Sequence, residues 1–218
     1  MTDFAVIETR AAKAQLDIFG AFHPGPDDDL PADIRTLLLL GPREPGFWPI
    51  ITASPEFNDG APDAIDRWSR RVIGHLACDL GAKAYFPFSG PPWRPFIRWA
   101  QRSGHAWASE VGILVHDRAG LMVSYRGALG LHERLALPAP GQRPCDTCRA
   151  KPCLTACPVD ALGPTGYDVP TCKSHLDTRT GKSTCMASGC LVRRACPVSQ
   201  RYARDPDQSA YHMRYFHP

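Results

Sequence analysis

The sequence CDTCRAKPCLTACP occupies residues 145–158, and the sequence CMASGCLVRRACP occupies residues 185–197. Together with Cys172, which lies between them, these stretches hold eight of the nine cysteines of the chain. Both stretches run into the same four residues, Ala-Cys-Pro-Val, at 156–159 and at 195–198. The region therefore resembles two halves of one plan, each with three cysteines before a Cys-Pro pair.

This spacing favours iron–sulfur clusters, because each iron of a cubane cluster takes one thiolate and a cluster therefore needs four cysteines. In two-cluster ferredoxins, the cysteine that precedes proline binds the cluster of the other half. Applied to this chain, that rule gives two sets of ligands. We expect one [4Fe–4S] cluster on Cys145, Cys148, Cys153 and Cys196, and a second on Cys157, Cys172, Cys185 and Cys190.

Three other interpretations of these cysteines stay open. Zinc also binds sets of four cysteines, although the repeated Cys-Pro ending is not typical of zinc sites. Disulfides would require an oxidising compartment, and the N-terminus carries no pattern of a secretory signal. A single cluster with spare cysteines is the third interpretation, since the second half is spaced unusually.

The composition is that of an ordinary globular protein, with 44% hydrophobic and 22% charged residues among 218. A net charge of +3 is too small to indicate binding to nucleic acid. No apolar run approaches the ~20 residues of a membrane helix. We therefore expect a cytoplasmic protein that binds neither membranes nor nucleic acid.

The cysteines also divide the chain into two predicted domains. Residues 1–138 contain only Cys78, which is expected to be a small core residue of a helix, and a Pro-rich stretch follows at 137–141. Residues 139–218 have few apolar side chains and an aromatic C-terminal tail, so a metal centre is expected to hold them together. The predicted fold class is α+β, with a mixed α/β layer before a loop-rich, ferredoxin-like dicluster domain.

Hydrophobic periodicity predicts the elements of the first domain. Strands are expected at Thr36–Leu40 and Ala84–Phe88, and helices at Ala61–Leu80 and Trp93–Ser103. A hairpin is expected from Val111–His116 and Leu121–Tyr125, joined across residues 117–120.

Cys145 to Pro197 resembles the dicluster ferredoxin-type part of epoxyqueuosine reductases and reductive dehalogenases. Residues 172–176, Cys-Lys-Ser-His-Leu, are similar to the Cys-x-Ser-Tyr-Leu stretch of the first family, and Gly189-Cys190 is similar to its closing Gly-Cys. One cysteine of that family is missing between them, and Cys185 is expected to replace it. A weaker similarity in the order of elements extends upstream to about residue 84.

The resemblance implies that residues 1–138 are either a scaffold or a degenerate cobalamin-binding domain. Where the family has its proton-donating Asp, this chain has Phe88, which cannot supply a proton. His105 or Glu110 could substitute as an acid, or either could be an ordinary polar residue. We therefore expect an electron-transfer protein. The alternative is a cobalamin- or flavin-dependent reductase whose clusters reduce the cofactor.

The charge of the cysteine-rich region suggests the kind of partner. Between residues 140 and 205 the chain has ten Lys or Arg residues and five Asp residues. Such an excess could steer an acidic redox partner protein towards the clusters.

Overall fold

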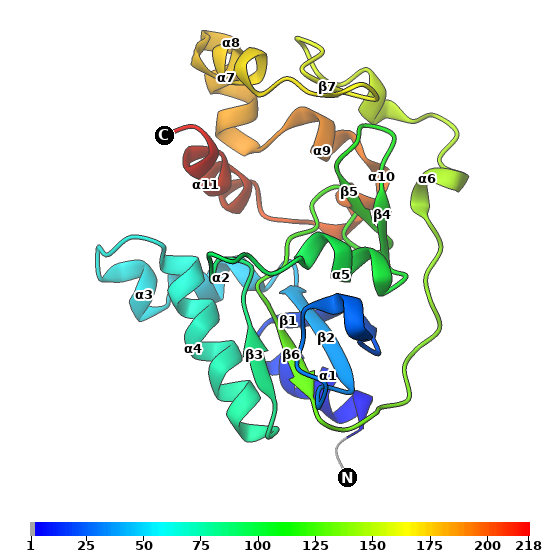
Figure 1. The fold of residues 1–218 in the computed structure, drawn as a ribbon. Coiled ribbons are helices and arrows are strands. Elements are labelled where there is room, and N and C mark those ends of the chain that lie inside the picture. Colours follow the sequence, from blue (N-terminus) through cyan, green and yellow to red (C-terminus); the bar gives the residue numbers. More distant parts are fainter. Residues whose placement is uncertain (1–2) are drawn as a thin grey trace. The chain divides into compact units, whose positions relative to one another are not determined.

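The computed structural model describes residues 3–218 and shows a mixed α+β fold with 44% helix and 15% strand (Figure 1). The sheets are small and antiparallel. In the part of the chain that the structure describes, no helix is both long enough and apolar enough to cross a membrane.

The chain forms two compact units that do not coincide with a single cut in the sequence. The sheet unit contains the chain up to His105 together with Ser124–Gly141. The cysteine unit contains Ala106–Val123 together with Gln142–Pro218. Residues 106–123, which the sequence assigned to the first domain, therefore belong to the same unit as the cysteines.

The sheet unit is built on one four-stranded antiparallel sheet with the strand order β1-β2-β6-β3. Its elements are α1 (Phe4–Lys13), β1 (Leu16–Phe22), η1 (Pro26–Asp28), β2 (Thr36–Pro42), α2 (Phe47–Thr52), α3 (Pro55–Asn58), α4 (Ala64–Asp79), β3 (Lys83–Tyr85), α5 (Phe96–Arg102) and β6 (Gly127–Leu131). Every residue of β2 is buried, as expected for a strand with neighbours on both sides. Helix α4 packs on β3 and β6, whereas α1 and α5 pack on β1.

Most predicted elements of this unit are present. The strand at Thr36–Leu40 and the helices at Ala61–Leu80 and Trp93–Ser103 are confirmed as β2, α4 and α5. The strand expected at Ala84–Phe88 stops at Tyr85. Cys78 is exposed, so the prediction of a core residue is wrong, because the buried face of α4 carries Trp68, Ile73 and Leu76 instead.

The cysteine unit consists of short elements separated by turns. They are β4 (Ala106–Ala108), β5 (Leu114–His116), α6 (Pro144–Thr147), η2 (Pro152–Leu154), β7 (Leu162–Gly163), β8 (Gly166–Tyr167), α7 (Val169–Asp177), α8 (Arg179–Gly181), η3 (Lys182–Met186), α9 (Leu191–Ala195), α10 (Pro197–Tyr202) and α11 (Pro206–Phe216). Helix α11 contains most of the aromatic tail and packs on η3, and Phe216 stacks on Tyr167 with ring centroids 6.1 Å apart.

The hairpin differs from its prediction. Strand β5 pairs with β4, and residues 121–125 form no strand although the turn at 117–120 is present. The reason is that other groups take the hydrogen bonds of Leu121: its N–H donates to Ser199 Oγ (2.8 Å), and its carbonyl accepts from Arg193. These partners fasten the chain after the turn to α9 and α10 rather than to a neighbouring strand.

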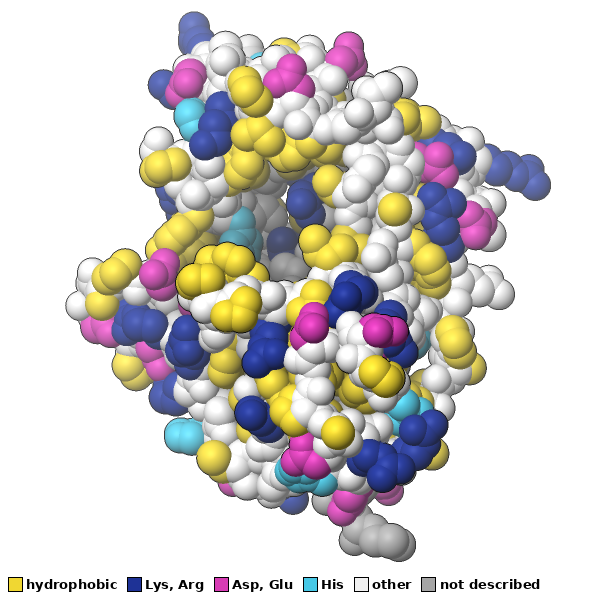
Figure 2. Space-filling view, viewed as in Figure 1, with side chains coloured by type: hydrophobic (Ala, Val, Ile, Leu, Met, Phe, Trp, Pro, Cys, Tyr) yellow, Lys and Arg dark blue, Asp and Glu magenta, His cyan; other side chains and the backbone are white. Residues whose placement is uncertain are grey.

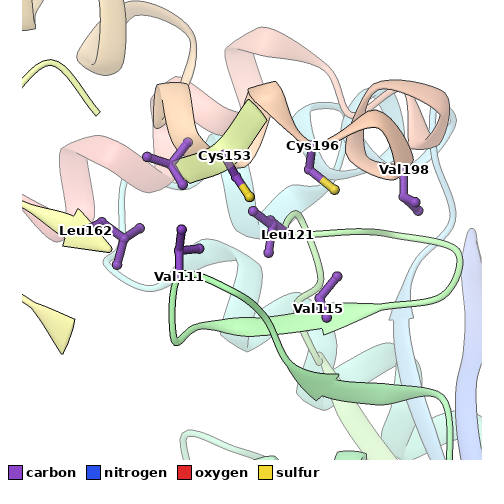
Figure 3. Packing of buried hydrophobic residues seen from close by; sticks show 8 residues of the cluster. Val111, Val115, Leu121, Cys153, Leu162, Cys196 and Val198 are labelled. Carbon is purple, nitrogen blue, oxygen red and sulfur yellow. The ribbon is translucent and has the colours of Figure 1, made fainter. Parts of the chain in front are cut away.

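The core of the cysteine unit is small and includes sulfur atoms (Figure 3). Its buried members are Val111, Val115, Leu121, Cys153, Leu162, Val192, Cys196 and Val198. Three of these come from residues 106–123, far ahead of the cysteines in sequence. The upstream hairpin therefore supplies apolar surface that the cysteine-rich segment itself lacks.

Candidate metal centre

Four thiols from both ends of the cysteine-rich segment line one pocket of about 490 Å³. They belong to Cys145, Cys148, Cys153 and Cys196, which we call the first quartet. Burial raises the pKa of the Cys153 thiol, and the charges of the other three thiols raise it further, as expected for sulfur atoms that lie close together. Figure 3 shows the sulfur atoms of Cys153 and Cys196 on the side that faces Leu121.

The hairpin forms part of the surroundings of the first quartet. Burial raises the pKa of the Cys145 thiol, and the backbone of Glu110 opposes that rise. Arg143 and Lys151 each approach Glu110 Oε1 to 3.3 Å, and Arg143 also pairs with Asp146 at 2.7 Å. Two carboxylates, Glu110 and Asp146, therefore pair with two of the cations beside this quartet.

The remaining four cysteines of the segment form the second quartet: Cys157, Cys172, Cys185 and Cys190. Burial raises the pKa of the Cys172 thiol, and the charges of Cys157 and Cys185 raise it further. Burial likewise raises the pKa of Cys190, and Cys185 adds to that rise. Cys185 lies in η3, a single turn of π-helix, a conformation that is frequent at functional sites.

Hydrogen-bond donors surround the thiols of the second quartet. The Ala161 N–H donates to Cys157 Sγ (3.2 Å), and the Tyr167 hydroxyl donates to Cys172 Sγ (3.3 Å). Cys190 is the N-cap residue of α9, and the backbone of Arg193 and Val192 at the start of that helix opposes the rise in the pKa of its thiol that burial causes. Such bonds stabilise negative charge on sulfur, so they suit thiolates that bind a metal.

Arg193 on α9 is a further cation beside the second quartet. Its side chain is partly buried, and its guanidinium donates to the carbonyl of Leu121. Burial lowers the pKa of Arg193, whereas the thiol of Cys190 and the phenol of Tyr167 raise it. No sequence pattern indicates that this arginine, among ten basic residues of the region, lies beside the thiols.

The donor set fits iron–sulfur clusters in its chemistry. All nine cysteines lie in the described part of the chain and are free thiols there. Within residues 3–218, no group of three or more His, Cys, Asp or Glu side chains is arranged to hold one metal ion. Ligands of a single zinc ion must converge on one point, whereas each thiolate of a cubane binds its own iron.

The candidate acids have other contacts. Glu110 is paired with Arg143 and Lys151 in the cysteine unit, whereas His105 lies in the sheet unit.

Phe88, which stands where the resembling family has its acid, lies against Phe86 with ring centroids 5.3 Å apart. The guanidinium carbon of Arg70 is 5.1 Å from the centre of the Phe88 ring. These contacts give Phe88 a packing role.

The surface around α6 carries charges of both signs. Figure 2 shows dark blue Lys and Arg side chains interspersed with magenta Asp and Glu side chains there, at the right of the view. Arg149 and Arg201 line the pocket of the first quartet and are exposed.

The comparisons with known proteins add no relative. No protein-family model matches the chain. No curated protein and no solved structure matches it significantly.

Proposed function

We propose that the cysteine unit holds two [4Fe–4S] clusters and that the chain transfers single electrons. The observation that carries this proposal is the grouping of the thiols. Cys196 joins Cys145, Cys148 and Cys153 around one pocket, and Cys157 lies with cysteines that follow it. Each quartet thus combines three cysteines of one half of the segment with the cysteine that precedes proline in the other half, as in two-cluster ferredoxins.

The surroundings of the thiols suit this role. A cubane cluster accepts or releases one electron without needing a bound proton. The apolar core contacts sulfur atoms of both quartets and so limits the access of water to them. The N–H donor to Cys157 and the O–H donor to Cys172 stabilise the negative charge that reduction adds.

We propose an acidic redox protein as the partner. The exposed Arg149 and Arg201 line the pocket of the first quartet, so a negatively charged surface would be attracted to that side of the unit. The rate of reduction by such a partner should fall as salt concentration rises. A rate that does not depend on salt would contradict electrostatic docking.

Chemical analysis of anaerobically purified protein tests the clusters directly. Two cubanes require about eight iron and about eight sulfide per chain, and they give a brown protein. About four of each would indicate one cluster. A folded, colourless protein that contains zinc, or neither iron nor sulfide, would overturn the proposal.

Serine variants test the composition of the quartets. Cys196→Ser should impair the first cluster and Cys157→Ser the second, and each should also lower thermal stability because metal binding supplies folding energy. Cys78→Ser is the matched control, since this exposed cysteine belongs to neither quartet. If the iron content and melting of Cys157→Ser equal those of the control, the assignment of ligands is wrong.

A reductase that uses cobalamin or flavin is the second candidate. It is supported by the order of β3, α5 and the β4–β5 hairpin, which follows the order that the family resemblance implies. Phe88 counts against it, because the residue at that position cannot donate a proton. Titration of the intact chain with cobalamin and with flavin separates the candidates: binding at micromolar levels favours the reductase.

A further inference from the structure

The two quartets differ in how their neighbouring cations are neutralised. Beside the first quartet, Glu110 and Asp146 pair with Arg143 and Lys151. Arg149 and Arg201 line the same pocket but are exposed, so solvent and salt screen their charges. The cations of the first quartet's pocket are therefore either paired with a carboxylate or exposed.

Arg193 beside the second quartet has no such compensation. Among residues 3–218 no carboxylate pairs with it, and its guanidinium donates a hydrogen bond to the neutral carbonyl of Leu121. A partly desolvated cation without a counter-ion is costly unless negative charge lies nearby. The thiol of Cys190 and the phenol of Tyr167 act on it, and the phenol is itself hydrogen-bonded to Cys172. As a cluster ligand, Cys190 would be a thiolate and would carry that negative charge.

The position of Arg193 is fixed from two sides. Cys190 occupies the N-cap position of α9, and Arg193 is three residues later, so the two side chains are neighbours on the helix. The guanidinium of Arg193 donates a hydrogen bond to the carbonyl of Leu121, directly after the turn at residues 117–120. The N–H of Leu121 in turn donates to Ser199 Oγ, which holds Leu121 in place. A cation that cannot move away acts on a nearby charge at full strength, without the cost of reorganisation.

We propose that Arg193 is the fixed counter-charge of the second quartet's cluster and makes it the cluster with the higher reduction potential. This inference rests on the proposed function. When dithionite supplies one electron per chain, the second cluster is reduced and the first stays oxidised. The arginine keeps its proton throughout, so the step moves one electron and no proton.

Potentiometric titration of the full chain, followed by electron paramagnetic resonance, tests the proposal. The signal of the second cluster is identified with Cys172→Ser, which alters that signal alone. In Arg193→Gln, the equilibrium constant for reduction of the second cluster should fall about tenfold, which is about 59 mV for a one-electron couple. The first cluster should keep its potential.

Two further variants separate charge from packing. Arg194→Gln removes the neighbouring exposed arginine, which bonds Ser188 Oγ at 2.8 Å, and should leave both potentials unchanged. Arg193→Lys keeps the charge, so the reduction potential of its second cluster should stay close to that of the wild type.

The outcomes are distinguishable. Unchanged potentials in Arg193→Gln, or an equal shift in Arg193→Lys, would overturn the role of the charge. If Arg193→Gln fails to load the second cluster, loading in Arg193→Lys supports the proposal and failure in both overturns it. Wild-type protein without iron and sulfide would overturn the proposed function itself.

Discussion

Single residues around the thiols decide how each sulfur atom is stabilised. The cysteines themselves were identifiable from their spacing and from the repeated Cys-Pro pair. Tyr167 and Arg193 were not, because a phenol or guanidinium gives no sequence signal of the sulfur atom that it faces. Cys145, Cys148, Cys153 and Cys196 line one pocket, and the assignment of the eight cysteines as ligands of two clusters stays a prediction.

The hydroxyl of Tyr167 gives a prediction at this scale. Burial raises the pKa of Tyr167, and its bond to Cys172 raises it further, so the phenol stays a proton donor at neutral pH. Tyr167→Phe should disfavour reduction of the second cluster by about 0.5–1.5 kcal/mol, the net worth of one hydrogen bond. A redox titration measures this shift. Tyr215→Phe, whose hydroxyl bonds Tyr211, is the control and should behave as wild type.

Among the elements, identical tetrapeptides have different structures. After Cys196, Pro197 opens helix α10, as proline often does at the first helical position. After Cys157, the same Pro-Val pair leads into a turn in which Asp160 has a positive φ. Pro164 disfavours helix at Gly163, whereas Ser199 to Arg201 carry no such breaker.

The helical periodicity of α4 and α5 was strong enough to predict both helices. The path of the chain after the turn at residues 117–120 was not predictable in this way, because tertiary hydrogen bonds decide it.

Gly120 gives a prediction for the contact between this turn and α10. Its φ is +57°, and a Cβ there would lie 2.4 Å from the backbone nitrogen of Ser199. Gly120→Ala should therefore destabilise the protein by roughly 2–4 kcal/mol through backbone strain and overlap. Urea unfolding measures the loss. Gly112→Ala is the control in the same hairpin, because its φ is also positive (+78°) but the nearest atom is 3.9 Å away; equal losses would contradict the role of the overlap.

The ion pair between Glu56 of α3 and Arg71 of α4 gives a prediction about how stability depends on pH. Two hydrogen bonds from Arg71 hold Glu56, and the pKa of Glu56 is lowered from 4.5 to about 2, chiefly by these bonds. Because the pKa is lower in the folded protein, this stabilisation is complete above pH 4.5 and is lost as the pH falls towards 2. Glu56→Gln should cost about 1–3 kcal/mol at pH 7, since Arg71 is partly exposed to solvent.

Tryptophan fluorescence during urea unfolding can follow that loss, because four of the five tryptophans lie in the sheet unit. The difference between wild type and Glu56→Gln should close between pH 4.5 and 2. Glu8→Gln, at an exposed position of α1, is the control. A difference that stays constant over this range would contradict the ion pair's role.

At the scale of the whole molecule, each unit is made of two separate stretches of chain. The sequence indicated an α+β fold and a change in composition near residue 138, and composition alone cannot show that residues 106–123 leave the first unit. That segment has the strand-like pattern of its neighbours. Its assignment depends on Val111, Val115 and Leu121 packing on Cys153 and Cys196, which are contacts between distant parts of the sequence.

Two fragments test this arrangement. Residues 142–218 expressed alone lack the hairpin, so we expect them to retain less than half of the iron of the full chain and to unfold without a cooperative transition. Residues 106–218 restore the hairpin and should bind more iron. Iron analysis and calorimetry measure both, and equal iron in the two fragments would show that the hairpin is dispensable.

The interleaving of the quartets also has a consequence for biosynthesis. The chain is made from its N-terminus, so the second quartet is complete once Cys190 has been added, whereas the first waits for Cys196. A nascent chain released early by the ribosome, at any point before Cys196, carries an incomplete first site. If the quartets hold clusters as proposed, factors that deliver iron and sulfide would meet a complete second site before a complete first one. The quartet whose first cysteine comes later in the chain would then be loaded first.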